Sequence, residues 1–443
     1  MTFNKNNQSG FTLVETLVGS AVFVVVALAT YQAFGVLMDA VSVSQAKLAG
    51  TTLANQEIEI IRNLPYADVG IQNGIPAGNI QRNQALVQNN YSFNVQTTIR
   101  NVDDPFDGTA GGSPADTSPA DYKLVDLDIT CSNCKTLAPL NFTTLVAPHA
   151  LETASTNGSL FIQVFDSSGN PVTSASIHIV NTQTNPDTVI DDTTDNTGWL
   201  KIIDAPPGVN AYNITASKTG YTQDQTYPPG GAAGPTPVKP DATVVKQQVT
   251  QTSFTIDKVS SLSIATVNAS CVALPSIGFS LTGTKLIGTP AVLKYPTQSF
   301  TTNSSGNYSI PTIEWDTYSA LLTSASYDLA GTTPLPSFAI NPNQAQNLQL
   351  VAVPHVNRAL LVSVQTSAGA TIDGATVRLQ KSGFDQTETT NSGSCATPGQ
   401  VFWNGLASGT YTITVTKTGY QTNITSNYSV SSNWQSKIIT LSP

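Results

Sequence analysis

The chain has 443 residues, which at about 100–200 residues per domain predicts roughly three domains. Charged residues make up only 11% of it, and 28 acidic against 19 basic residues give a net charge of -9. This balance argues against nucleic acid as a partner, because phosphate binding needs a clustered positive field. The chain has only three histidines and four cysteines, so few groups are present for acid–base, zinc or thiol chemistry, which argues against an enzyme.

One segment near the N-terminus is long and apolar enough to cross a membrane. Residues 16–38 carry no formal charge, and a helix of that length spans roughly 34 Å. A cleaved secretory signal is the alternative, but its apolar part is usually only about 7–15 residues long. Lys5 precedes the segment and Asp39 is the first charge after it. The positive-inside bias therefore favours a cytoplasmic N-terminus, with everything after the helix outside.

The residues just ahead of the apolar segment form a distinctive junction. A short polar leader, residues 1–10, ends in Ser9-Gly10; Phe11 follows, and Glu15 comes four residues later. This junction resembles the class III leader of type IV prepilins and pseudopilins. The resemblance implies that a membrane-embedded prepilin peptidase cuts between Gly10 and Phe11 and methylates the new terminal amine of Phe11.

The same resemblance extends to about residue 66. Residues 54–57 and 62–66 are similar to the corresponding stretch of bacterial minor prepilins, and apolar residues continue at near-helical spacing until Pro65. We therefore expect one long helix within residues 11–66. In the family this resembles, the inner half of that helix packs in the filament core, and the outer half lies on the first globular domain.

Glu15 can be interpreted without the family. An ionised carboxylate in hydrocarbon costs about 3 kcal/mol on insertion scales, so it needs a partner or a functional reason. Cleavage at Gly10 creates a partner, because the amine of Phe11 on a neighbouring subunit lies at the same membrane depth. The alternative is a hydrated glutamate near the interface before assembly, and the two interpretations are compatible at different stages.

Residues 67–150 are predicted to form a small pilin-like domain on this helix. Three apolar runs within it are strand-like, at residues 91–99, 123–129 and 140–146. Together with the β-rich remainder of the chain, they place the protein in the α+β class.

Carboxylates gather between the first two of these runs. Asp103, Asp104 and Asp107 lie in one turn-rich stretch, and Asp116 and Asp121 follow a Gly/Ser/Pro-rich segment. Calcium prefers six to eight oxygen ligands, so these residues are candidates for a calcium site. The alternative is a solvated acidic loop built from Asx-turns. The sequence predicts no other cofactor.

The four cysteines allow few pairings. Cys131 and Cys134 form a C-x-x-C pair that follows a predicted strand. A redox motif normally opens a helix at this point, but no helical pattern follows this pair. A zinc site would need a second pair, whereas Cys271 and Cys395 stand alone. Outside the cytoplasm a local disulfide between Cys131 and Cys134 is the simplest state. Pairing of Cys271 with Cys395 is left open, because they belong to different predicted modules.

The rest of the chain contains repeats. Residues 216–221 recur as residues 415–420, a gap that fits two modules of about 100 residues each. A fainter intermediate copy predicts three modules in all, over residues 157–256, 257–353 and 356–443.

Each module alternates apolar and polar residues between frequent turns, which is typical of an antiparallel sandwich. The first module, through Gly169–Val172, Pro206–Gly208 and Gly220-Tyr221, resembles the carboxypeptidase regulatory-like domain family. The third does so through Gly409–Tyr411 and Gly419-Tyr420. The resemblance implies a transthyretin-like, immunoglobulin-type sandwich and says little about activity. The middle module departs from this pattern.

Aromatic residues in the modules have two interpretations. Trp199, Trp403, Tyr221 and Tyr420 are most simply packed in the core or at an edge, while a row of exposed rings could bind sugars. The alternation around His178 places that residue at an outward strand position rather than in a ligand set.

The sequence as a whole predicts a structural subunit. We expect a minor pilin or pseudopilin-like protein that spans the cytoplasmic membrane once, joins other pilin subunits through its N-terminal helix, and displays its modules outside in a filament or pseudopilus. A low-copy or tip position suits three bulky modules. The alternative is an adhesin whose modules bind a surface ligand. A membrane-tethered enzyme lacks support, because the sequence shows no nucleophile–base signature.

Overall fold

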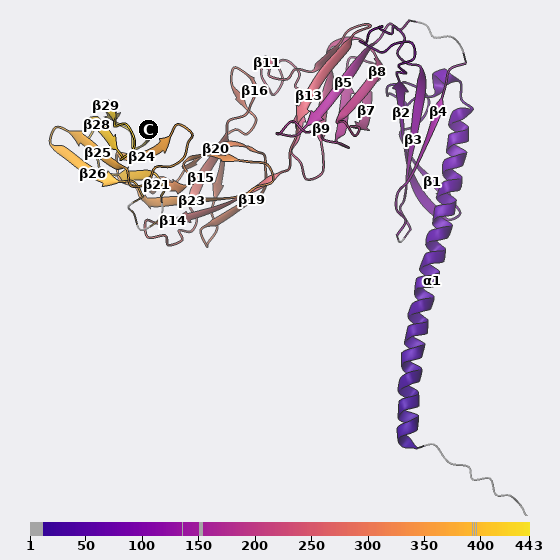
Figure 1. The fold of residues 1–443 in the computed structure, drawn as a ribbon, viewed down its shortest axis with the longest axis horizontal. Coiled ribbons are helices and arrows are strands. Elements are labelled where there is room, and N and C mark those ends of the chain that lie inside the picture. The colour runs from indigo at the N-terminus through magenta and orange to yellow at the C-terminus, as the bar shows by residue number, and fades with distance from the viewer. Residues whose placement is uncertain (1–11, 135, 150–153, 392, 394, 396) are drawn as a thin grey trace, which may run out of the picture.

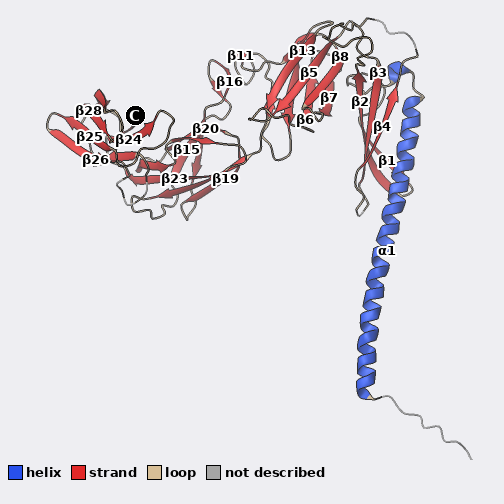
Figure 2. Cartoon of the chain, viewed as in Figure 1, coloured by secondary structure: helices blue, strands red, loops and turns tan. Residues whose placement is uncertain are grey.

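The computed structural model describes residues 12–134, 136–149, 154–391, 393, 395 and 397–443. A single long helix is followed by β-sheets to the end of the chain (Figure 1). The predicted α+β class is confirmed. Figure 2 shows the helix as an upright rod and the sheets as a series of layered units that extends sideways from its upper end.

Helix α1 (Leu13–Arg62) is 50 residues long, and only its second half touches the rest of the chain. Thr12 caps it by accepting the Glu15 N–H at 3.2 Å, and Asn63 ends it two residues before Pro65. The buried positions are mostly small residues, namely Ala46, Ala49, Gly50, Leu53, Ala54 and Ile61. At Gly50 an added Cβ would lie 2.8 Å from Leu140 Cδ1 and 3.3 Å from Phe93 Cε1, so a larger residue there would require these side chains to shift.

The sheet beneath the helix has four antiparallel strands in sequence order. They are β1 (Asn83–Gln88), β2 (Tyr91–Val102), β3 (Tyr122–Cys131) and β4 (Leu140–Val146). Alternate residues of β2, including Phe93, Val95 and Ile99, face the helix and form its core. A 3-10 turn, η1 (Tyr66–Asp68), leads from the helix toward this sheet. The face of the sheet that points away from the helix is polar, and it contacts the next unit of the chain.

The next unit packs two sheets around one core. One sheet has the order β13-β5-β8, and the other has the order β10-β9-β6-β7, with β12 also pairing with β9. The strands are β5 (Gly158–Phe165), β6 (Ser176–Asn181), β7 (Thr188–Thr193), β8 (Trp199–Ala205), β9 (Gly208–Ser217), β10 (Asp224–Gln225), β12 (Ala242–Val244) and β13 (Val249–Thr255). Leu160, Ile177 and Tyr212 are among its fully buried side chains.

The second sandwich pairs the sheet β19-β14-β23-β21 with the sheet β18-β15-β20-β22. Its strands are β14 (Ser260–Val267), β15 (Gly278–Gly283), β18 (Gln298–Thr301), β19 (Asn307–Ile313), β20 (Asp316–Leu322), β21 (Tyr327–Thr333), β22 (Ser337–Ile340) and β23 (Ala345–Pro354). Its last strand pairs in parallel with its first, just as β13 pairs with β5. The middle unit departs from the repeated sequence motifs, but its first and last strands pair in the same way as those of the first sandwich.

The third sandwich pairs the sheet β27-β24-β30 with the sheet β26-β25-β28-β29. Its strands are β24 (Ala359–Thr366), β25 (Thr376–Lys381), β26 (Phe384–Thr389), β27 (Gln400–Trp403), β28 (Gly409–Thr416), β29 (Asn423–Val430) and β30 (Trp434–Leu441). Trp403 lies in its core, and Tyr420 packs against that core. The preceding residue, Gly419, has φ of +85°, and Gly220 has φ of +79° in the first sandwich, which explains why the repeated motif needs glycine there.

A small extra sheet joins the first two sandwiches. Strand β11 (Thr236–Pro237) lies in a proline-rich excursion of the first sandwich, residues 228–240. It pairs with β16 (Leu286–Thr289) of the second sandwich, and β16 pairs with β17 (Val292–Leu293). At Gly288 an added Cβ would lie 1.6 Å from the Ala233 carbonyl oxygen, so the two segments touch backbone to backbone. The excursion is thus a structural connection between units.

Candidate functional site

The N-terminal half of α1 is an apolar surface that the described part of the chain leaves uncovered. It is long and apolar enough to cross a membrane, and no residue in its most apolar window is buried. Glu15 lies in the first turn with its side chain exposed, at the positive end of the helix dipole. The predicted cleavage site, Gly10 and Phe11, lies outside the described residues.

The acidic loop brings together a different set of carboxylates from the one predicted. Ligand oxygens of Asp103, Asp116 and Asp121 lie within 4.8 Å of one another. Asp104 and Asp107 do not belong to this group, so it contains one of the predicted calcium ligands Asp103, Asp104 and Asp107 together with Asp116 and Asp121. Calcium binding at this loop stays a prediction. Asp104 instead accepts the Phe106 N–H at 3.1 Å in an Asx-turn, and Asp107 is exposed.

Backbone N–H groups fix one oxygen of each grouped carboxylate. Asp103 accepts the Ala110 N–H at 2.9 Å, Asp116 accepts the Ser118 N–H at 2.8 Å, and Asp121 accepts the Asp104 N–H. The second oxygens of Asp103 and Asp116 are shielded from solvent and have no hydrogen-bond partner within the described residues.

The electrostatics of Asp103 fit this crowding. Partial burial raises the pKa of Asp103, and the charges of Asp121 and Asp116 raise it further, against the opposing hydrogen bond from the Ala110 N–H. A divalent cation would relieve both the missing solvation and the mutual repulsion. A calcium ion would therefore stabilise this group of three carboxylates, which repel one another without it.

All four cysteines lie in disulfides. Cys131 is bonded to Cys134 at the end of β3, and Cys271 is bonded to Cys395. The second bond, left open by the sequence, ties the loop after β14 to the segment between β26 and β27. It therefore links the second sandwich to the third.

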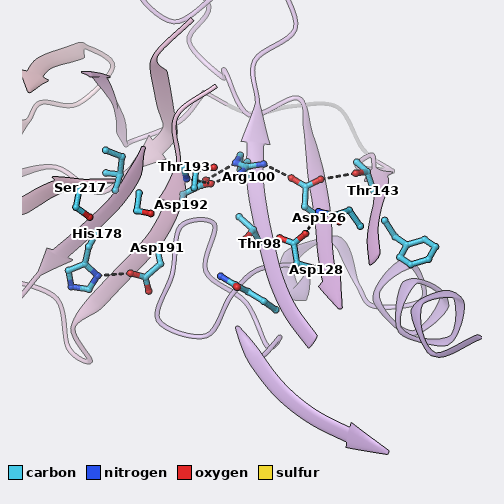
Figure 3. A pocket seen from close by; sticks show the side chains of 15 residues that line it. Thr98, Arg100, Asp126, Asp128, Thr143, His178, Asp191, Asp192, Thr193 and Ser217 are labelled. Carbon is cyan, nitrogen blue, oxygen red and sulfur yellow. Dashed lines mark hydrogen bonds and ion pairs between the residues drawn. The ribbon is translucent and has the colours of Figure 1, made fainter. Parts of the chain in front are cut away.

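A charged junction joins the first sheet to the first sandwich (Figure 3). Arg100 on β2 lies between Asp126 on β3 and Asp192 on β7, and its Nε donates to Asp192 at 2.6 Å. Arg82, just before β1, contacts Asp191 and the Val189 carbonyl oxygen of β7. Burial acts to lower the pKa of Arg100, but the hydrogen bonds and charges of Asp192 and Asp126 outweigh it and raise that pKa.

Beside this junction lies a polar cleft of about 490 Å³ between the two sheets. Its carboxylates are already paired, as Figure 3 shows: Asp126 also accepts from Thr143, and Asp191 contacts the His178 ring at 2.5 Å. His178 is exposed, at the outward strand position that the sequence predicts. Because these groups satisfy one another, the arrangement serves as a docking contact between units.

Sequence reasoning missed this junction. Arg82 and Arg100 pair with carboxylates 109 and 92 residues away, and no local pattern indicates such a pairing. The only available signal was composition, since two isolated arginines in a chain with so few basic residues needed partners.

Comparison with known proteins identifies one segment. Residues 5–31 match the prokaryotic N-terminal methylation motif, which includes the predicted cleavage site and the start of α1. No curated protein matches the chain. Together with the exposed apolar helix, the motif supports a pilin-like subunit that is anchored in a membrane.

Solved structures give only distant likenesses. The Bacillus anthracis TIE protein is 14% identical over 82% of this chain and 74% of its own, with a TM-score of 0.21. The Streptococcal ancillary pilin is 12% identical over 64% of this chain and 98% of its own, with a TM-score of 0.18. The minor pilin GBS52 of Streptococcus agalactiae is 12% identical over 41% and 95%, with a TM-score of 0.17. Scores this low carry no argument about this chain.

Proposed function

We propose that the chain is a minor pilin or pseudopilin-like subunit of a type IV filament or a related secretion or uptake machine. The observation that carries the proposal is the methylation motif at residues 5–31, which runs directly into an uncovered apolar helix. Such a surface needs lipid before assembly and other subunits afterwards, because exposing it to water costs roughly 25 cal/mol per Å².

The arrangement of the outer units supports a particular position for the subunit. Three sandwiches extend to one side of the helix rather than along it (Figure 1). A lattice in which every subunit carried them would be crowded, so a low-copy position or the tip suits this chain. The second candidate function is that of an adhesin, in which the sandwiches display a binding site at that position.

The mature N-terminus tests the main proposal. Processing between Gly10 and Phe11 predicts a chain that begins with N-methylated Phe11, because prepilin peptidases cut and methylate at this junction in the family it resembles. Mass spectrometry of protein purified from peptidase-containing cells reads this directly. Peptidase-deficient cells are the control and should retain residues 1–10. An intact leader in the first sample would contradict the proposal.

We also propose that Asp103, Asp116 and Asp121 hold calcium in the exported part. Three carboxylates, each fixed through one oxygen by a backbone N–H, converge on one point. The ion would tie the long β2–β3 loop together beside the junction with the first sandwich. It would supply charge neutralisation and rigidity and no catalytic step.

A further inference from the structure

A second cleft at the junction differs in character from the charged one. It measures about 550 Å³, shares Arg100 and Thr193 with the first cleft, and is lined by two aromatic rings, Phe161 and Trp199. Clefts of about 300–1,000 Å³ between domains are usual places for small-molecule sites.

The two rings lie on the outer face of their sheet. In β8, Leu200 and Ile202 point into the core of the sandwich, so the alternation of the strand turns Trp199 and Lys201 outward. In β5 the same alternation turns Phe161 outward, directly opposite Lys201.

Both rings remain partly exposed, and neither belongs to a described hydrophobic core. The Lys201 ammonium group lies 5.3 Å from the centroid of the Phe161 ring. Trp199 is positioned by Asp195, which accepts its backbone N–H at 2.9 Å. The cleft therefore presents two aromatic rings, and the Lys201 ammonium group lies over the face of the Phe161 ring.

Charged side chains of both signs line this cleft. Two cations, Arg100 and Lys201, face two carboxylates, Asp103 and Asp195. Arg100 is also held by partners outside the cleft, so it offers little free charge. The hydroxyl of Thr109 adds an uncharged hydrogen-bonding group. A strongly charged ligand finds no complementary field here, and a fully apolar one would desolvate the polar rim without replacing its hydrogen bonds.

We propose that this cleft binds a neutral saccharide. A pyranose ring has an apolar C–H face that can stack on an aromatic ring, and its edges carry hydroxyl groups that both donate and accept hydrogen bonds. Trp199 supplies the stacking surface, Phe161 with the Lys201 ammonium group over its ring forms part of the wall, and Lys201, Asp195 and Thr109 supply polar partners. The inference gives a ligand class to the adhesin role, and it does not depend on filament assembly.

The test uses the full chain in a detergent without a sugar headgroup, because a glycoside detergent would compete. Calorimetric titration with maltotriose, cellotriose and triacetylchitotriose should show binding of at least one probe with a Kd of about 1 mM or tighter. Trp199→Ala should weaken that binding at least about 10-fold, whereas Trp199→Phe, which keeps a ring, should weaken it less. The Trp199→Phe variant thereby separates lost stacking from misfolding.

Phe106→Ala is the matched control, because Phe106 is 97% exposed in the neighbouring loop and does not line the cleft. It should bind the probe like the wild type. Three outcomes would overturn the inference: no probe binds at about 10 mM, Trp199→Ala binds as tightly as the wild type, or Phe106→Ala weakens binding as much as Trp199→Ala does. None of these outcomes bears on processing at Gly10, so the saccharide site and the pilin role can fail separately.

Discussion

The carboxylate of Glu15 is proposed to direct assembly by pairing with a neighbouring subunit. Its carboxylate would cost about 3 kcal/mol in hydrocarbon without a partner, and the amine of Phe11 on the neighbouring subunit would supply one. We expect Glu15→Ala to insert into membranes like the wild type but to reach filaments at about a tenth of the wild-type level or less, since about 1.4 kcal/mol of lost pairing suffices for a factor of ten. Immunoblots of membrane and sheared-filament fractions measure both.

Asp39→Asn is the control for this substitution, because it removes a carboxylate beyond the apolar segment. It should leave filament incorporation unchanged. Wild-type incorporation of Glu15→Ala would remove the proposed role of the carboxylate.

The aspartate group predicts a response to calcium. An ion that binds only the folded state stabilises it by about 2.7 kcal/mol at a concentration 100 times its Kd. Calcium should therefore raise the melting temperature of the unit that contains β1–β4, and chelation should lower it again. Asp116→Asn should abolish the shift by removing a ligand oxygen, whereas Asp107→Asn, outside the group, should keep it. Differential scanning calorimetry with and without calcium is the measurement, and an unshifted wild type would count against the site.

The sequence located the acidic loop but could not select its members. Asp103, Asp104 and Asp107 are adjacent in sequence, and adjacency made them the natural set. In the structure Asp103 is instead grouped with Asp116 and Asp121, which follow a Gly/Ser/Pro-rich stretch. Asp104 forms a local Asx-turn. The conformation of that loop determines which carboxylates come together. An irregular loop has no repeating pattern of residues from which its conformation could be predicted.

Arg100 holds the first sheet to the first sandwich at the level of elements. Its partner Asp192 is only 4% exposed, so removing the guanidinium leaves a buried carboxylate unpaired. We expect Arg100→Ala to destabilise the junction by about 2–5 kcal/mol, because stranding one member of a buried ion pair is costly. Hydrogen exchange of the β7 amides measures the effect locally, which matters in a chain with several cooperative units.

Two further variants sharpen this prediction. Arg378→Ala breaks the Arg378–Asp385 pair, whose side chains are about half exposed (48% and 50%), and should destabilise the chain far less, because solvent screens an exposed ion pair. Adding Asp192→Ala to Arg100→Ala should recover part of the loss, since it removes the stranded charge. Equal protection of β7 in the wild type and in Arg100→Ala would show that the ion pair does not hold the junction.

Elements with a strong period were predictable, and the others were not. The long helix and the cores of β2, β3 and β4 lie where the sequence places them, because apolar spacing determines which face is buried. Strand β1 (Asn83–Gln88) was missed because Asn and Gln dilute its alternation; its pairing with β2 through Asn89 and Asn90, both at positive φ, defines it. Trp199 was expected in a core or at an edge, and it lies on β8, an edge strand of its sheet, on the same outward face as Lys201. The alternation could not show that this face lines a cleft with another unit, because that contact depends on residues far away in the sequence.

At the scale of the whole molecule, the units that follow α1 are connected to one another at every junction. The ion pairs of Arg82 and Arg100 join the first sheet to the first sandwich, the sheet β11-β16-β17 joins the first two sandwiches, and the Cys271–Cys395 disulfide joins the last two. At the last junction Gln400 of the third sandwich also accepts the Thr332 N–H at 3.0 Å. The outer units therefore form a semi-rigid arm, which suits a role that places a site at a distance from the filament.

The disulfide gives this arm a measurable mechanical property. It closes a loop of 124 residues. When the two termini are pulled apart, this loop cannot extend while the disulfide is intact, so roughly 450 Å of chain, at about 3.6 Å per residue, does not contribute to the extended length. Single-molecule force spectroscopy of Cys271→Ser should therefore show a fully extended chain longer than the wild type by that amount. The fold should also lose up to about 4.7 kcal/mol, because the unfolded state gains the entropy of an open loop.

Cys131→Ser is the matched control, since the separation of Cys131 and Cys134 is only 3 residues. Loss of that disulfide should lengthen the extended chain by only roughly 10 Å. If Cys271→Ser and the wild type extended to the same length, no disulfide would join the second and third sandwiches, and the outermost unit would be free to separate under load.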